Sequence, residues 1–161
     1  MGDYARRSRE LSLEALPGEV RAAIQRHREA NNLGPILDDY EMCMETVSVR
    51  RKWGLFKRQG GRQVTSYAIL TPTWLVYAVT DPAGVTSALS VKLEDATVED
   101  YASSPIYAKM PDSGFHVTGN FTGQVGMHGR QQVSIFLGLG EERAAVTFGE
   151  ALMDAIANTR R

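Results

Sequence analysis

The chain has 161 residues, of which 43% are hydrophobic and 23% are charged, and its formal net charge is −1. A chain of this length can bury about two-thirds of its unfolded surface, so it needs neither a disulfide nor a metal ion to fold. The near-zero charge excludes a general attraction to nucleic acid or to an anionic membrane. Cys43 is the only cysteine, which excludes an intramolecular disulfide and a cysteine-rich zinc site.

The sequence carries no signal of membrane insertion or secretion. No apolar run approaches the ~18 residues of a transmembrane helix. The first residues, Met-Gly-Asp-Tyr-Ala-Arg-Arg, lack the apolar core of a secretory signal. We therefore expect a cytoplasmic protein.

Residues 1–36 are expected to form a polar, helical N-terminal extension. Val20, Ala23 and Ile24 recur at helical spacing, with arginines between and after them. Because the segment has few large apolar residues, we expect it to pack on the outside of a domain formed by residues 37–161.

Short apolar segments with turn residues between them predict an antiparallel β protein after this extension. Strands are expected near residues 42–49, 64–70, 74–80, 85–93, 96–101, 115–121 and 133–139. The clearest hairpin has its turn at Thr71-Pro72-Thr73, between two segments rich in β-branched and aromatic residues. Residues 102–114 contain two prolines and are expected to be a loop.

A C-terminal amphipathic helix is expected over about residues 141–159. Ala145, Phe148, Leu152 and Ile156 are spaced so that they share one face of such a helix. This face must dock on a sheet or on the end of a barrel. The predicted fold is therefore mostly β, in the α+β class.

This order of elements resembles the pleckstrin-homology (PH) superfold, in which a bent seven-strand barrel is capped by a C-terminal helix. Residues 65–77, Thr-Ser-Tyr-Ala-Ile-Leu-Thr-Pro-Thr-Trp-Leu-Val-Tyr, are similar to a hairpin of bacterial PH-like and GRAM-like domains. The resemblance covers about residues 40–160. Eukaryotic PH domains carry a tryptophan in the C-terminal helix where Phe148 stands here, so a bacterial relative is nearer. The resemblance implies a PH-like antiparallel barrel of about seven strands.

Residues 50–62 are the most informative segment for function, because they contain six cations and no acidic residue. These candidate anion-binding residues are Arg50, Arg51, Lys52, Lys57, Arg58 and Arg62. The resemblance places Arg51, Lys57, Arg58 and Arg62 on the loop between the first two barrel strands, where PH-like domains commonly hold anionic head groups. Trp53, Leu55 and Phe56 lie among the cations, a pattern that suits contact with an anionic membrane or a partner protein. The pattern favours a solvated basic turn, with its aromatic residues folded back onto the barrel, over a site for an anionic partner.

Three other patterns favour structural explanations over catalytic or metal sites. Residues 119–129 are rich in glycine but lack the Gly-Lys-Ser/Thr ending of a phosphate loop, so they predict a flexible hairpin loop. His116 and His128 can meet across one hairpin, but no cysteine or carboxylate pair completes a metal shell. Cys43 lies between two methionines in a predicted strand and is expected to be buried.

Four acidic residues, Glu94, Asp95, Glu99 and Asp100, lie close together in the sequence. They predict a solvated strand edge, because charge protects an edge strand from unwanted pairing. A pair of carboxylates for acid and base catalysis is the alternative.

We therefore predict a non-catalytic PH-like binding module without cofactor or metal, cytoplasmic or peripheral to a membrane. Its expected partner is an anionic lipid surface or an acidic protein surface. A scaffold that self-assembles into a homo-oligomer through strand edges stays open as an alternative, and a small-ligand carrier or enzyme is a third. Nucleic acid is not expected as a partner, because the basic residues occupy one loop.

Overall fold

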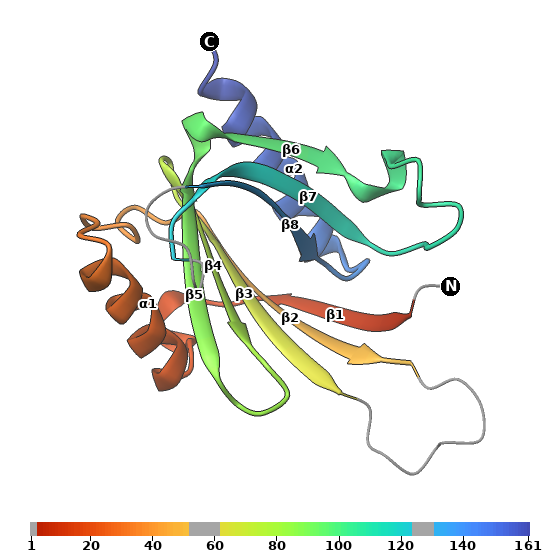
Figure 1. Cartoon of the computed structure of the whole chain (residues 1–161), viewed down its shortest axis with the longest axis horizontal. Coiled ribbons are helices and arrows are strands. Elements are labelled where there is room, and N and C mark those ends of the chain that lie inside the picture. The colour runs from red at the N-terminus through yellow and green to blue at the C-terminus, as the bar shows by residue number, and fades with distance from the viewer. Residues whose placement is uncertain (1–2, 52–61, 124–130) are drawn as a thin grey trace.

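The structure is a computed structural model that describes residues 3–51, 62–123 and 131–161. In these ranges the chain forms a five-stranded and a three-stranded antiparallel sheet and two α-helices (Figure 1). The mostly β, α+β class predicted from the sequence is therefore confirmed.

The five-stranded sheet has the order β1-β2-β3-β4-β5, so each strand pairs with its neighbour in the sequence. Its strands are β1 (Tyr4–Glu10), β2 (Met42–Arg50), β3 (Gln63–Leu70), β4 (Trp74–Thr80) and β5 (Thr86–Lys92). The predicted hairpin between β3 and β4 is present. Its turn is held by Thr71 Oγ1, which accepts hydrogen bonds from the N–H groups of Thr73 and Trp74 at 3.3 and 2.8 Å.

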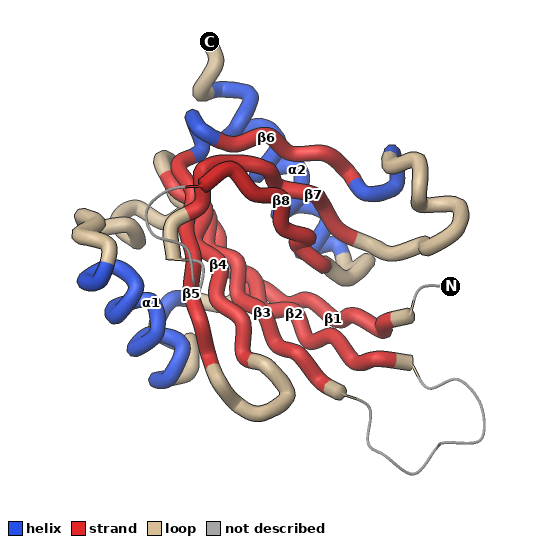
Figure 2. The backbone as a smooth tube through the Cα atoms, in the orientation of Figure 1, coloured by secondary structure: helices blue, strands red, loops and turns tan. Residues whose placement is uncertain are grey.

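The three-stranded sheet has the order β6-β7-β8. Its strands are β6 (Ala96–Asp100), β7 (Gly114–Phe121) and β8 (Gln131–Gly138). A β-bridge between Ser90 of β5 and Thr122 joins this sheet to the first. On the opposite side, β1 and β8 are outer strands and do not pair with each other within the described residues (Figure 2). The two sheets are therefore joined on one side only and form no closed barrel in the described part of the chain.

The two helices lie in different places: α1 (Gly18–Ala30) is outside the five-stranded sheet, and α2 (Arg143–Asn158) contacts strands of both sheets (Figure 1). Helix α1 packs on the outer face of the five-stranded sheet, over β4 and β5. Helix α2 buries Ala145, Phe148, Leu152 and Ile156 in the core between the sheets, as the sequence predicts. No helix in the described ranges is long and apolar enough to cross a bilayer.

The first part of the N-terminal segment differs from the prediction. Residues 4–10 form strand β1 instead of a helix and pair with β2 from Tyr4 opposite Arg50 to Glu10 opposite Met44. The prediction was wrong here because Tyr4, Arg6 and Ser8 share one face of the strand, and this face is polar and not apolar. The sequence of β1 therefore lacks the alternation of apolar and polar residues by which a strand is recognised.

Candidate functional site

The basic segment of residues 50–62 connects β2 to β3. The structure describes three of its cations, Arg50, Arg51 and Arg62, which we call the arginine cluster. The other candidates lie outside the described residues: Lys52, Trp53, Leu55, Phe56, Lys57 and Arg58. The Arg50 N–H donates to Arg62 O at 3.2 Å, and the Arg51 N–H donates to Asp3 O at 2.7 Å. The cluster therefore lies at the end of the sheet where β1 begins, β2 ends and β3 begins.

The arginines in this part of the sheet differ in their pairing. Arg6 is paired with Asp112, and Arg9 with Glu45. Among the described residues, no carboxylate lies within ion-pair distance of Arg7 or of the arginine cluster. These arginines are therefore free to meet a negative charge from outside.

A groove of about 760 Å³ borders the arginine cluster and runs along β1. One wall is formed by Tyr4, Arg6 and Arg7 of β1 together with Arg51. The opposite wall consists mainly of residues 111–113, which precede β7, and residues 140–142, which follow β8. The groove therefore lies on the side of the molecule where the two sheets are not joined.

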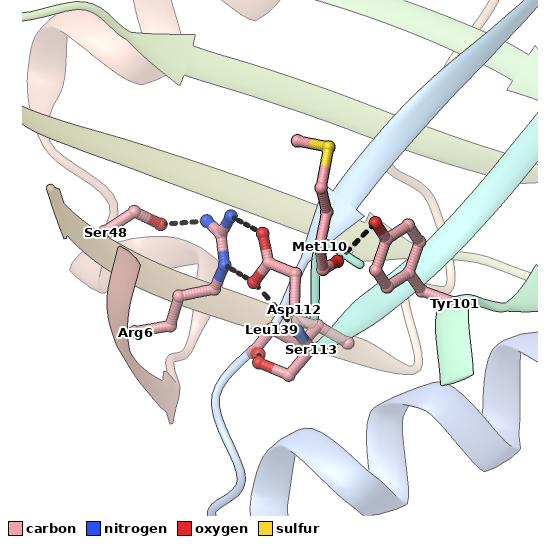
Figure 3. A network of polar contacts seen from close by, with 7 residues as sticks. All are labelled: Arg6, Ser48, Tyr101, Met110, Asp112, Ser113 and Leu139. Atoms are coloured by element: carbon pink, nitrogen blue, oxygen red, sulfur yellow. Dashed lines mark hydrogen bonds and ion pairs between the residues drawn. The ribbon is translucent and has the colours of Figure 1, made fainter. Parts of the chain in front are cut away.

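Arg6 crosses from β1 to the opposite wall (Figure 3). Its Nε and Nη2 atoms donate to the two carboxylate oxygens of Asp112 at 3.0 and 2.8 Å, and Nη1 donates to Ser48 Oγ at 2.6 Å. The guanidinium also lies over the rings of Tyr4 and Phe136, 4.9 and 5.3 Å from their centroids. A two-pronged pair of this kind fixes the geometry of both groups. Arg6 and Asp112 therefore hold the two walls together.

The wall opposite β1 is held by further hydrogen bonds (Figure 3). The Ser113 N–H donates to Asp112 Oδ1 at 2.8 Å, and the Ser113 hydroxyl donates to Leu139 O at 2.5 Å. The Tyr101 hydroxyl donates to Met110 O at 2.6 Å. The Ser113 hydroxyl therefore ties the segment before β7 to Leu139, directly after β8, and the Tyr101 hydroxyl ties the same segment to the residues that follow β6.

Cys43 and His116, two of the remaining candidates, have structural roles. Cys43 is 0% exposed, as predicted, and burial raises the pKa of its thiol to about 12. His116 packs against the rings of Tyr101 and Phe136, and the described residues contain no group of three side chains that can hold a metal ion. His128, the other half of the predicted pair, lies outside the described residues.

The acidic residues lie where a charged edge was predicted. Glu99 and Asp100 are exposed on β6, an outer strand of the three-stranded sheet. Glu94 and Asp95 belong to the short 3₁₀ turn before β6. For Glu99 and Asp100, the prediction of a solvated strand edge is confirmed.

Sequence reasoning missed one buried polar site, at His27. Its Nε2 atom lies 2.8 Å from Ser90 Oγ, and its Nδ1 atom lies 3.2 Å from Asn31 Nδ2. Since Asn31 Nδ2 is a donor, Nδ1 accepts and Nε2–H donates to Ser90. Burial lowers the pKa of His27, which favours this neutral form. Its position one turn after Ala23, on the buried face of α1, was the available signal.

Ser90 is fully buried, so the contact between His27 and Ser90 anchors α1 to β5 and is closed to a substrate. The arginine cluster and the groove beside it form the accessible candidate site, and Arg51 belongs to both. Comparison of the chain with models of known protein families, with curated proteins and with solved structures gave no match.

Proposed function

We propose that the protein is a non-catalytic, PH-like binding module that holds an anionic group at the arginine cluster. The observation that carries the proposal is the absence of a carboxylate partner for Arg50, Arg51 and Arg62 among the described residues, beside arginines that are ion-paired. An unpaired cation on a folded surface is available for a ligand without first breaking an internal contact.

The order of elements supports the PH-like part of the proposal. Strands β2–β8 are seven consecutive antiparallel strands in two sheets, and α2 follows them with its apolar face in the core. This is the order that the sequence resemblance predicts, with β1 and α1 placed before it. In that alignment the arginine cluster lies on the connection between the first two of the seven strands, where PH-like domains commonly bind head groups.

Arginine has the right chemistry for this role. Its guanidinium stays charged at neutral pH and presents a planar set of donors that fits phosphate and carboxylate oxygens. Each cation near an anionic membrane contributes about 1 kcal/mol to binding. The same connection carries three further cations in the sequence, Lys52, Lys57 and Arg58. Such an interaction is expected to weaken as salt rises.

The non-catalytic part of the proposal rests on how the polar groups of the groove are used. Arg6 and Asp112 neutralise each other, and the Ser113 hydroxyl donates to a backbone carbonyl. Within the described residues, none of these groups faces a partner that could activate it as a nucleophile or as a base.

The experiment is sedimentation of the whole chain with vesicles of phosphatidylcholine alone and of phosphatidylcholine with phosphatidylserine. The test variant is Arg50→Gln/Arg51→Gln/Arg62→Gln. The control variant is Arg21→Gln/Arg26→Gln/Arg28→Gln, which removes the same charge from α1. We expect binding to the anionic vesicles only, lost in the test variant, kept in the control and weakened by salt.

Equal losses in the two variants would show that net charge alone decides binding. Absence of binding to anionic vesicles by the unmodified protein would exclude a lipid surface. Titration with soluble inositol phosphates separates recognition of a head group from attraction to a charged surface.

A further inference from the structure

Strand β1 turns part of its backbone toward the groove. The Leu11 N–H donates to Cys43 O at 2.8 Å, and the Arg51 N–H donates to Asp3 O at 2.7 Å. In the antiparallel register of β1 and β2, these two bonds place the odd-numbered residues of β1 in hydrogen-bonded pairs with β2. The N–H and C=O groups of the even-numbered residues, Tyr4, Arg6, Ser8 and Glu10, therefore point away from β2.

Among these outward backbone groups, the N–H at Ser8 forms a hydrogen bond, and the N–H groups at the Tyr4 end of the strand do not within the described residues. The Ser8 N–H donates to Glu142 Oε2 at 3.1 Å, so a side-chain oxygen takes the place that the carbonyl of an adjacent strand would occupy. Within the described part of the chain, the outward N–H groups of Tyr4 and Arg6 have no partner, and both residues line the groove. A sheet edge with free donors and acceptors is a template for another strand.

The charges along the groove differ between its two ends. Arg51 lies beside the start of β1, where its N–H donates to Asp3 O. Glu142 lies near the other end, at Ser8, and Glu141 precedes it in the same wall. The groove therefore offers positive charge at the Tyr4 end and negative charge at the Ser8 end.

We propose that the groove binds an extended peptide that adds to β1 as an antiparallel strand through Tyr4 and Arg6. Because β1 runs from Tyr4 toward Ser8, an antiparallel peptide has its carboxyl end at Arg51 and its amino end at Glu141. Its terminal carboxylate or acidic side chains meet Arg51, and its amino-terminal part meets the acidic wall. The site goes beyond the proposed function, because it lies along β1 and uses backbone groups.

The dimensions and charges of β1 define the occupant further. Tyr4 to Ser8 spans about 13 Å at ~3.3 Å per residue, so the paired part of the peptide is about four residues long. A second copy of β1 is a poor occupant, because Arg6, Arg7 and Arg9 of two copies would approach one another. An acidic peptide instead meets Arg7 and Arg51, which line the groove and have no carboxylate partner among the described residues.

The first test is selection of binders from a library of random short peptides with free carboxyl ends, using the whole chain as bait. We expect enrichment of Asp and Glu toward the carboxyl end and of β-branched residues before them. A synthesised binder should slow hydrogen exchange at the Tyr4 and Arg6 amides, and amidation of its carboxyl end should weaken binding. Enrichment without acidic residues, or protection confined to another strand, would overturn the proposal.

The second test removes the outward donor of Tyr4. Tyr4→Pro and Tyr4→Val both remove the ring, but only proline removes the N–H, and proline is tolerated at the first residue of an edge strand. We expect Tyr4→Pro to bind the selected peptide about fivefold more weakly than Tyr4→Val, which equals about 1 kcal/mol or one net hydrogen bond. Equal affinities of the two variants would exclude pairing at this position.

The experiments can reject peptide pairing with β1 without rejecting anion binding at the arginine cluster, and the reverse. Urea unfolding of both Tyr4 variants verifies that they are folded to the same extent. Vesicle binding of Tyr4→Pro should equal that of Tyr4→Val, because Arg50 and Arg62 are unchanged.

Discussion

Among the polar contacts that link distant parts of the described chain, those of His27 and Arg6 differ in charge and in access. His27 connects α1 to Ser90 of β5 through a neutral, buried hydrogen bond. Arg6 connects β1 to Asp112 through an ion pair whose two side chains are 10% and 21% exposed, beside a groove of about 760 Å³. The first contact is buried, with His27 6% and Ser90 0% exposed, whereas the second faces a groove.

The comparison explains why one contact is only structural and the other borders the candidate site. A sealed hydrogen bond fixes how two elements pack, and nothing from outside can compete for it. A charge pair at the rim of a groove fixes the distance between the two walls. It also contributes to the electrostatic potential inside the groove. The following experiments test this difference, from the largest expected effect to the smallest.

Removal of one partner of the charged contact should cost the most stability. Asp112→Ala leaves the Arg6 guanidinium largely buried without its counter-charge, and we expect a loss of about 2 kcal/mol in the free energy of unfolding, measured in urea. Arg6→Ala/Asp112→Ala should be more stable than Asp112→Ala, because no buried charge is left unpaired.

The control is the pair of Arg9 and Glu45, in which the Arg9 side chain is 70% exposed and the Glu45 side chain 12%. Arg9→Ala should change stability far less than Asp112→Ala, because solvent screens this pair. Similar losses in the two variants would contradict the distinction between a largely buried and an exposed arginine.

A methyl group at Gly138 should disturb the same contact without removing a charge. A Cβ atom there would lie 2.5 Å from Arg6 Nη1, so the guanidinium must move, and we expect a loss of about 1 kcal/mol for Gly138→Ala. Gly18→Ala is the matched control, because no atom lies within 4 Å of a Cβ at that position. The loss should disappear in an Arg6→Ala background, and an undiminished loss there would show that another neighbour is responsible.

The neutral contact should make stability depend on pH. Burial lowers the pKa of His27 in the folded state, whereas the unfolded chain binds a proton with the ordinary pKa of about 6.5. Between pH 6.5 and the folded pKa the unfolded state therefore holds more protons, so the free energy of unfolding falls as pH falls. Above pH 6.5 the contribution of His27 is complete.

His27→Gln tests this origin of the pH dependence, since the amide can still donate to Ser90 but does not titrate. We expect a smaller decrease in stability below pH 6.5 than in the unmodified protein, measured by urea unfolding at several pH values. An unchanged pH dependence would assign it to other groups.

The smallest effect is expected for the reaction of the buried Cys43 thiol with a disulfide reagent in the folded protein. Cys43 is fully buried with a pKa raised to about 12, so it should react with a disulfide reagent only as fast as the protein unfolds. In a Cys43→Ala background, Arg7→Cys should react immediately, because residue 7 is exposed and lines the groove. Fast reaction of Cys43 in the native protein would show that the core under α1 opens readily.

The sequence predicted most of the fold because the apolar residues of the core recur at the spacings of strands and helices. Strands β2–β8 alternate or are continuously apolar, and α2 repeats its apolar residues at helical spacing, so each was recognised locally. Strand β1 was missed because the side chains on its inner face are Tyr4, Arg6, Ser8 and Glu10. A strand that faces a polar groove gives no apolar alternation.

The basic segment of residues 50–62 was singled out by its charge, its aromatic residues and the resemblance to PH-like domains, because consecutive cations are visible in any sequence. The groove was not predicted, since Arg6 and Asp112 are far apart in the chain and meet only after the two sheets have packed. The role of His27 was missed for the same reason, because Ser90 is distant in the sequence.

The sequence by itself therefore determined the class of the fold, the apolar faces and the position of the basic segment, since these depend on the spacing of neighbouring residues. The tertiary structure decided which arginines are paired, which strand edge is open and which polar groups are sealed. These properties depend on contacts between segments that only folding brings together.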